Sequence, residues 1–221
     1  MNDRVADYFI EAAGKYEGVE LLRIDDPTGK KEVSLPDRPS KANKWGADFY
    51  LSIHHNAGVG GGKGGGVVAF AYKNGGMAAK YRDAIYDAVI SAGGIKGDRS
   101  DPKATANFAV LRQTTMPAVL IECGFMDSTT DIPIIIKKEY SKLVGYAMME
   151  GVAKIAGLKK KEVKKVATVK KDNTPDKYAK TAVDWAVKNG ILAGDGNGDY
   201  KLHSNVTRQD MLVFLHRALT K

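Results

Sequence analysis

Apolar residues follow two different spacings in the first 157 residues of the chain. They recur three and four positions apart in four segments, which predicts helices at residues 3–15, 39–45, 77–92 and 135–155, the last as one long helix or two broken ones. Short apolar runs predict strands at residues 19–24, 47–53, 66–72 and 117–121. Strands that alternate with helices predict an α/β fold, with a twisted, mostly parallel sheet flanked by helices.

The composition changes near residue 158. Residues 159–171 contain seven lysines and one glutamate, a net charge of +6 in a chain whose total is +8. This run repels itself and has few large apolar side chains, so we interpret residues 158–175 as an extended linker. It is either a solvated spacer or a tether attracted to an anionic polymer. The linker separates a domain of residues 1–157 from a small α-helical module of residues 176–221.

Several classes of protein are excluded by the composition. No apolar run approaches 18 residues, so we expect no contact with a membrane interior. The single cysteine, Cys123, cannot form an intrachain disulfide. Because the excess positive charge is confined to the linker, nucleic acid is not an expected partner. The first residues lack a basic segment followed by an apolar one, so no secretory signal is expected in this chain.

Two of the predicted strands lead into polar residues. Residues 52–57 read Ser-Ile-His-His-Asn-Ala, and Glu122 directly follows the apolar run 117–121. Chemistry collects at the carboxyl ends of strands in such sheets. A carboxylate is costly to bury there unless it is paired, protonated or bound to a cation, and histidine is a common zinc ligand. The pattern predicts either metal-assisted hydrolysis or a structural histidine with a salt-bridged glutamate.

A glycine-rich segment follows the first of these motifs, at residues 58–66. Its Lys63 is followed by glycine and then by a predicted strand, whereas a phosphate-binding loop needs Ser or Thr after the lysine and then a helix. We therefore expect a flexible loop at the rim of the cleft.

Three segments together carry a family resemblance. They are residues 52–57, residues 107–112 (Asn-Phe-Ala-Val-Leu-Arg) and residues 116–127 (Met-Pro-Ala-Val-Leu-Ile-Glu-Cys-Gly-Phe-Met-Asp). In order and spacing they resemble the zinc-dependent N-acetylmuramoyl-L-alanine amidases of the type-3 family, found among phage endolysins and bacterial autolysins. The resemblance covers residues 1–157. It implies a peptidoglycan hydrolase that cleaves the amide bond between N-acetylmuramic acid and L-alanine of the stem peptide.

The same resemblance implies roles for individual residues. His54 matches the histidine that binds Zn²⁺, and Glu122 matches the catalytic acid/base that acts on zinc-activated water. His55 falls on a variable position, so we interpret it as a neighbour and not as a ligand. Asn56 either orients the loop that carries His54 or caps a turn. Cys123 is interpreted as a small buried apolar residue.

The chain departs from the family pattern at its beginning. Family members open with a strand ending in a Gly-His-Gly type of turn and with a glutamate before the first helix, which supply two of the three zinc ligands, and neither is found here. We therefore expect an N-terminally truncated domain whose first strand is missing. The alternatives are a trimmed form of a longer enzyme, a non-catalytic cell-wall-binding or assembly fragment, and an enzyme that recruits another ligand. An unpaired sheet edge also predicts self-association.

The C-terminal module carries a second resemblance. Trp185, Gly190-Ile191, Gly194-Asp195-Gly196 and residues 206–211 (Val-Thr-Arg-Gln-Asp-Met) are similar to one surface-layer homology repeat. Such helical repeats bind secondary cell-wall polymers of Gram-positive bacteria. Apolar spacing predicts a helix at 178–189, and Thr207 is predicted to cap a second one. A small helical bundle that closes over the core is the alternative.

Both resemblances together imply a modular lysin that acts at the bacterial cell wall. Its expected partners are peptidoglycan and a secondary cell-wall polymer. Without a signal in this chain, we expect release of holin type, or a signal lost with the N-terminus.

Overall fold

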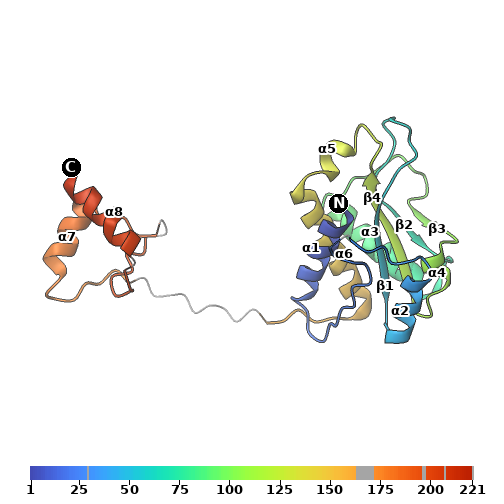
Figure 1. Ribbon diagram of the computed structural model, residues 1–221, viewed down its shortest axis with the longest axis horizontal. Coiled ribbons are helices and arrows are strands. Elements are labelled where there is room, and N and C mark those ends of the chain that lie inside the picture. The colour runs from blue at the N-terminus through green and yellow to red at the C-terminus, as the bar shows by residue number, and fades with distance from the viewer. Residues whose placement is uncertain (29, 163–171, 196–197, 207, 221) are drawn as a thin grey trace. The chain divides into compact units, whose positions relative to one another are not determined.

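The computed structural model describes residues 1–28, 30–162, 172–195, 198–206 and 208–220 (Figure 1). Residues 163–171, half of the predicted linker 158–175, and the predicted helix cap Thr207 therefore lie outside the described residues. The chain forms two compact units, Met1–Lys161 and Glu162–Lys221. Within the described ranges, none of the helices combines the length and apolar character needed to cross a bilayer.

The first unit contains one four-stranded sheet and six helices in the part of the chain that the structure describes. The strands are β1 (Tyr50–Asn56), β2 (Val68–Ala71), β3 (Lys103–Thr105) and β4 (Ala118–Phe125). The helices are α1 (Asn2–Ala13), α2 (Asp37–Trp45), α3 (Gly76–Ser91), α4 (Ala109–Arg112), α5 (Ile132–Ile135) and α6 (Lys138–Ala156). The strand order is β1-β4-β2-β3, with β1–β4 and β2–β3 parallel and β2–β4 antiparallel. The α/β prediction is confirmed, and the sheet is mixed.

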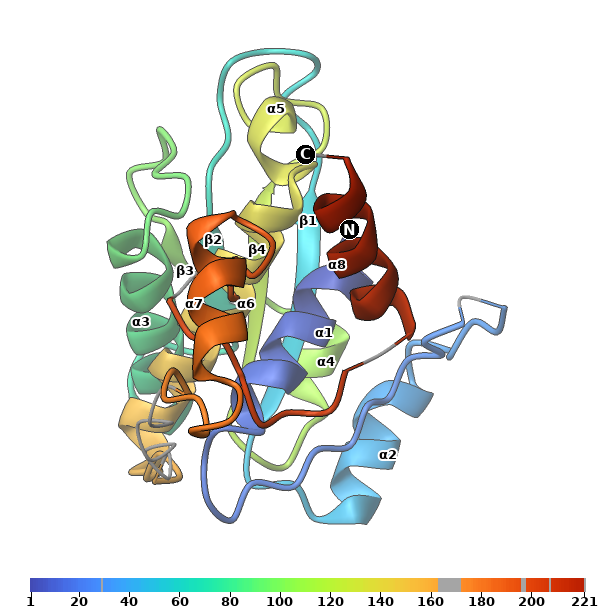
Figure 2. The same cartoon turned by 90° about the vertical axis from the view of Figure 1, so that its left-hand side faces the viewer.

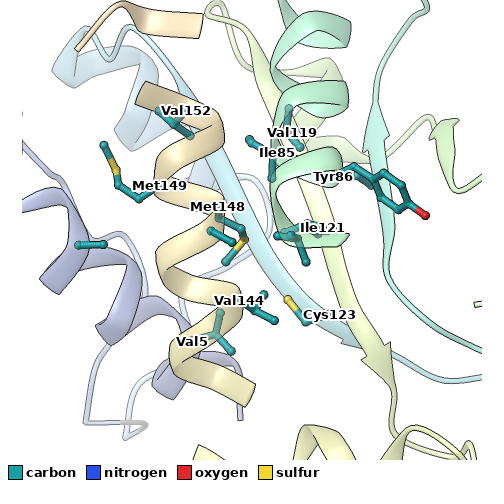
Figure 3. Close-up of a cluster of buried hydrophobic side chains, with 14 of the residues drawn as sticks. Val5, Ile85, Tyr86, Val119, Ile121, Cys123, Val144, Met148, Met149 and Val152 are labelled. Carbon is teal, nitrogen blue, oxygen red and sulfur yellow. The ribbon is translucent and has the colours of Figure 1, made fainter. Parts of the chain in front are cut away.

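Helices cover both faces of this sheet, as Figures 1 and 2 show. Alternate residues of β4 point to opposite faces. Val119, Ile121 and Cys123 join the larger core with α1, α3 and α6 (Figure 3). Ala118 and Leu120 join a smaller cluster with side chains of α2 and α4. Glu122 lies two residues beyond Leu120, so its side chain points to the same face of the sheet, the one covered by α2 and α4.

The helices on the larger core pack very closely. At Gly151 of α6, an added Cβ would lie 2.6 Å from the Cα atom of Ile85 in α3, so only glycine allows this approach. Ile85 itself is fully buried. Burial of a side chain of this size contributes about 1.5–3 kcal/mol. The closely packed pair α3 and α6 therefore covers the sheet face opposite to the one that carries Glu122.

The strand predicted at residues 19–24 is wrong. No ladder among the described residues includes this segment, and Leu21 and Leu22 are exposed. Arg23 instead ties the segment down through ion pairs with Asp3 and Asp7 of α1 and with Asp25. An apolar run forms a strand only where a neighbouring strand accepts its hydrogen bonds, and no strand in the described part of the chain pairs with this one. Consequently β1 is an edge strand in the described part of the chain.

In its described residues, the second unit contains two helices, α7 (Lys180–Lys188) and α8 (Arg208–Leu219), close to the two that were predicted. Polar contacts organise the segments around them. The Asp172 carboxylate accepts hydrogen bonds from the backbone N–H and the imidazole of His203. The Asp199 carboxylate accepts hydrogen bonds from the backbone N–H groups of Asp172, at 2.9 Å, and Lys201, at 3.0 Å.

Candidate active site

The parallel pairing of β1 with β4 brings His54 and Glu122 together. The two residues are direct partners in the ladder. Directly paired residues point to the same face of a sheet, so both side chains lie on the face under α2 and α4. The structure thus places the two residues singled out from the sequence side by side, near the carboxyl ends of adjacent strands.

A β-bulge follows the pair at once. After His54 and Glu122, the next paired residues are Asn56 and Phe125, so β4 contains one extra residue. Gly124 takes this place with a φ of +130°, and a Cβ there would lie 2.7 Å from a side-chain carbon of Ile135. Only glycine fits both requirements. Bulges of this kind bend a strand locally and re-aim neighbouring side chains.

The carboxyl group of Glu122 is poorly compensated. Its Oε2 atom is buried and has no hydrogen-bond partner among the described residues. Burial raises the pKa of this carboxyl to about 7, because the ionised form loses its hydration. Near neutral pH the group therefore exists in both protonation states, which suits a side chain that accepts and returns a proton.

His54 is held as a neutral imidazole. Its Nε2 atom lies 2.8 Å from the hydroxyl oxygen of Ser52 on the same strand. Burial, and secondarily the positive charge of Arg38, lowers the pKa of His54 below its ordinary value of 6.5. Neutral imidazole is the form that binds metal ions.

The described residues provide only part of a zinc site. A catalytic zinc takes three protein ligands and a water. Among residues 1–28, 30–162, 172–195, 198–206 and 208–220, no three His, Cys, Asp or Glu side chains group together closely enough to hold a metal ion. His54 and Glu122 offer one imidazole and one orphan carboxylate oxygen, so they do not by themselves fit a complete catalytic centre.

His55 and Cys123, which are next to this pair in the sequence, point to the opposite face of the sheet. His55 lies on the α1 side of the sheet, where its Nδ1 atom is 2.6 Å from the side-chain oxygen of Asn2. Burial lowers the pKa of His55 to about 4. Cys123 is fully buried in the larger core, and burial raises the pKa of its thiol far above the ordinary range, which leaves it inert as a nucleophile. The side-chain oxygen of Asn56 accepts a hydrogen bond from the backbone N–H of Ala57 at 2.8 Å.

The glycine-rich loop of residues 58–66 is anchored by carboxylates. Asp127 accepts hydrogen bonds from the backbone N–H groups of residues 58, 59 and 60. Asp131 accepts one from Gly66, and Asp98 accepts one from Gly65. The loop lies beside the turn after β4, at one end of the sheet, in both Figures 1 and 2. The expectation of a flexible loop overlooked these anchors, which come from segments distant in the sequence.

A cavity of about 730 Å³ follows the outer edge of β1. One wall is β1 from Tyr50 to His54, and the facing wall is the extended segment 18–26. Four exposed, large apolar side chains line it: Ile10, Leu21, Leu22 and Trp45. Arg38 also lines it, near His54. The cavity therefore runs along an unpaired strand edge and reaches His54, while Glu122 does not line it.

Comparison with protein families decides the relationship of the first unit. Residues 1–154 match the family model described as N-acetylmuramoyl-L-alanine amidase. The chain belongs to the N-acetylmuramoyl-L-alanine amidase family. Residues 171–212 match the S-layer homology domain. Both resemblances inferred from sequence motifs are thereby confirmed.

Relatives of this amidase-family chain include bacterial and phage proteins. A sporulation-specific N-acetylmuramoyl-L-alanine amidase of Bacillus subtilis (strain 168) is 39% identical over 147 residues, 66% of this chain and 54% of that protein. The endolysin of Bacillus phage SPP1 is 39% identical over 153 residues, 66% of this chain and 53% of the endolysin. The chain thus spans about half the length of the curated relatives it matches.

Solved structures agree on the amidase fold. An N-acetylmuramoyl-L-alanine amidase from Clostridium difficile 630 is 26% identical, with a TM-score of 0.61 over 70% of this chain and 81% of that chain. The catalytic domain of the amidase CwlV from Bacillus (Paenibacillus) polymyxa gives a TM-score of 0.62 at 21% identity, over 71% of this chain and 83% of that chain. The second likeness shows the fold alone.

Proposed function

We propose that the first unit hydrolyses the amide bond between N-acetylmuramic acid and the L-alanine of the peptidoglycan stem peptide. The observation that carries this proposal is the pairing of His54 with Glu122 on one sheet face, with a buried Glu122 oxygen that lacks a partner among the described residues. The family membership of residues 1–154 supports the same reaction.

The chemistry assigned to Glu122 follows from its environment. In its ionised form it takes a proton from the attacking water, whose oxygen bonds to the lactyl carbonyl carbon. When the C–N bond breaks, Glu122 returns that proton to the departing amine of L-alanine. The products are a lactyl carboxylate on the sugar and a stem peptide with a free amino terminus. A pKa of about 7 lets one group serve in both directions near neutral pH.

We assign His54 as one ligand of the zinc ion that the family implies. The further donors of a three-ligand set are not grouped with it in the described part of the chain. This assignment makes zinc dependence a matter for direct measurement.

The test is product analysis on purified peptidoglycan. The full chain is incubated with added ZnCl₂, and separately with a chelator, and new amino-terminal alanine is quantified by dinitrophenyl labelling. The proposal expects release of alanine-terminated stem peptides with zinc, loss of release with chelator, and a loss of about 10²-fold or more in Glu122→Gln. Release of new reducing ends instead of amino termini would refute it.

A second candidate function is a non-catalytic one, in which the first unit binds or organises the wall without cutting it. It is favoured by the lack of a three-residue metal-binding group among the described residues. The same assay separates the candidates. Binding of the chain to peptidoglycan with no new alanine termini, even with zinc, would select this one.

We assign the second unit to attachment on a secondary cell-wall polymer, on the strength of its S-layer homology match. The protein would then act at the bacterial cell wall. Sedimentation with purified walls, before and after chemical extraction of the secondary polymer, tests this. Extraction should abolish retention of a Glu122→Gln chain, and undiminished retention would count against the assignment.

We also propose that the chain associates with itself, and the unpaired edge of β1 supports this. Unpaired strand edges flanked by exposed apolar side chains recruit other strands. Light scattering after size exclusion should show a mass above 23.9 kDa that rises with concentration. A monomer at all concentrations would refute it.

A further inference from the structure

We propose that Asp127 is a positioning residue that binds the loop after β1 to the end of β4 and so fixes His54 relative to Glu122. The inference rests on the proposed amidase function. Asp127 is not a partner of either residue and is placed beyond the paired part of the strands, so its effect is indirect.

Several backbone hydrogen bonds converge on the carboxylate of Asp127. A single carboxylate oxygen, Oδ2, accepts three backbone hydrogen bonds, from Gly58 at 2.8 Å, Val59 at 2.9 Å and Gly60 at 2.9 Å. Next to it, the backbone N–H of Met126 donates to the carbonyl of Asn56 at 2.7 Å. The residues directly after β4 are therefore bound to the residues directly after β1.

The hydrogen bonds that join Asp127 to residues 58–60 and Met126 to Asn56 form a clamp, and this clamp lies where the sheet itself is weakest. The regular ladder is interrupted between the His54–Glu122 pair and the Asn56–Phe125 pair by the extra residue in β4. Beyond that bulge the chain enters a glycine-rich loop, and glycine loses more conformational freedom on ordering than any other residue. Without an anchor, the end of β1 would be free to shift against β4, and His54 would shift with it.

The charge on Asp127 strengthens the clamp. Its three backbone hydrogen bonds, that from Gly58 first, hold the pKa of the carboxyl below its ordinary value of 3.8, so it is ionised at neutral pH. Hydrogen bonds to an ionised acceptor are stronger than neutral ones. The other oxygen, Oδ1, is buried and has no partner among the described residues, which is a cost that the bonds to Oδ2 must offset.

Asp98 offers a matched control within the same loop. It accepts a single hydrogen bond, from the backbone N–H of Gly65 at 3.2 Å, at the far end of the loop from β1. If loop anchoring in general were what mattered, Asp98 and Asp127 would be equivalent. If the tie between the ends of β1 and β4 matters, only Asp127 affects the reaction.

The experiment compares Asp127→Ala, Asp127→Asn and Asp98→Ala in the full chain with added ZnCl₂. Steady-state release of alanine termini is measured below the melting temperature of every variant. We expect Asp127→Ala to lower kcat about 10²-fold with KM changed less than about 3-fold, as misplacement by about 1 Å does. Asp127→Asn, which keeps an acceptor oxygen, should recover most of that loss, and Asp98→Ala, which removes the other anchor, should stay within about 3-fold of the unaltered chain. Equal losses in Asp98→Ala and Asp127→Ala, or a loss confined to KM, would overturn the inference.

Hydrogen exchange in the same samples gives a readout independent of activity. Asp127→Ala should deprotect the amides of Gly58, Gly60 and Met126, and Asp98→Ala should leave them protected. If the unaltered chain proves inactive yet shows this pattern, the proposed function fails while the tie between the strand ends stands. Unchanged protection in Asp127→Ala would overturn the inference whatever the activity.

Discussion

The two units of this chain bury their side chains to very different degrees. In the first, α6 alone contributes Val144, Met148 and Met149 to a core that is closed to solvent. In the second, all residues of α7 and α8 are described and none is buried. Trp185 and Leu212 are 56% and 66% exposed.

This difference shows what each unit can do with its own residues. The first buries enough apolar surface to hold two paired strands, and the polar groups at their ends, in a fixed geometry. The second has apolar residues on several sides of α8, a pattern typical of a helix that other elements cover. Single modules of this size are marginally stable by themselves. A catalytic geometry is therefore expected in the first unit, and dependence on partners in the second.

The comparison predicts the largest loss of stability for truncation of a core side chain. Ile85→Ala should lower the free energy of unfolding of the first unit by about 2–5 kcal/mol, because it opens a cavity between α3 and α6. Leu212→Ala, on an exposed position of α8, should change that of the second unit by less than about 0.5 kcal/mol.

The two tryptophans allow each unit to be followed separately. Denaturant unfolding is monitored through Trp45 in a Trp185→Phe background, and through Trp185 in a Trp45→Phe background. A loss of more than 2 kcal/mol in Leu212→Ala would show that α8 is buried after all, and the comparison would fail.

A smaller effect is expected from the pH dependence of the first unit. The pKa of Glu122 is raised in the folded state, from 4.5 to about 7. Its stabilising contribution is thus complete below pH 4.5 and is lost as the pH rises through 7. Glu122→Gln removes this dependence. Between pH 4 and pH 8, the free energy of unfolding of the variant should rise by roughly 1–2 kcal/mol relative to that of the unaltered chain, after allowance for solvent screening.

Urea unfolding at the two pH values measures this difference. Parallel stability profiles for Glu122→Gln and the unaltered chain between pH 4 and pH 8 would show that the carboxyl is not desolvated.

The smallest effect is expected in the second unit, where the titrating pair is exposed to solvent. The hydrogen bond to Asp172 raises the pKa of His203, so this contribution is present below pH 6.5 and is lost as the pH rises through the raised value. Hydrogen bonds from His203 lower the pKa of Asp172, so that contribution is present above pH 3.8 and is lost as the pH falls. The second unit should be most stable between these limits.

His203→Gln should flatten the alkaline side of this profile, as followed through the fluorescence of Trp185. A profile that is unchanged by the substitution would show that the contact does not contribute.

Much of this arrangement could be predicted from the sequence, because it depends on local patterns. Apolar spacing located α3 and α6, and the polar residues after two apolar runs pointed to His54 and Glu122. Whether a run forms a strand depends on pairing with a neighbouring strand, however, and residues 19–24 pair with none among the described residues. The same limit hid Asp127, since nothing local indicates that its carboxylate binds amides 67 to 69 positions earlier.

The central claim is that His54 and Glu122 act as one unit on the amide bond. A double-mutant cycle on peptidoglycan, with rates of alanine-terminus release for His54→Ala, Glu122→Gln and the double variant, tests it most directly. The account predicts that each single substitution lowers kcat about 10²-fold or more, and that the double variant is no slower than the worse single one. Full activity in Glu122→Gln, or two losses that multiply in the double variant, would contradict it.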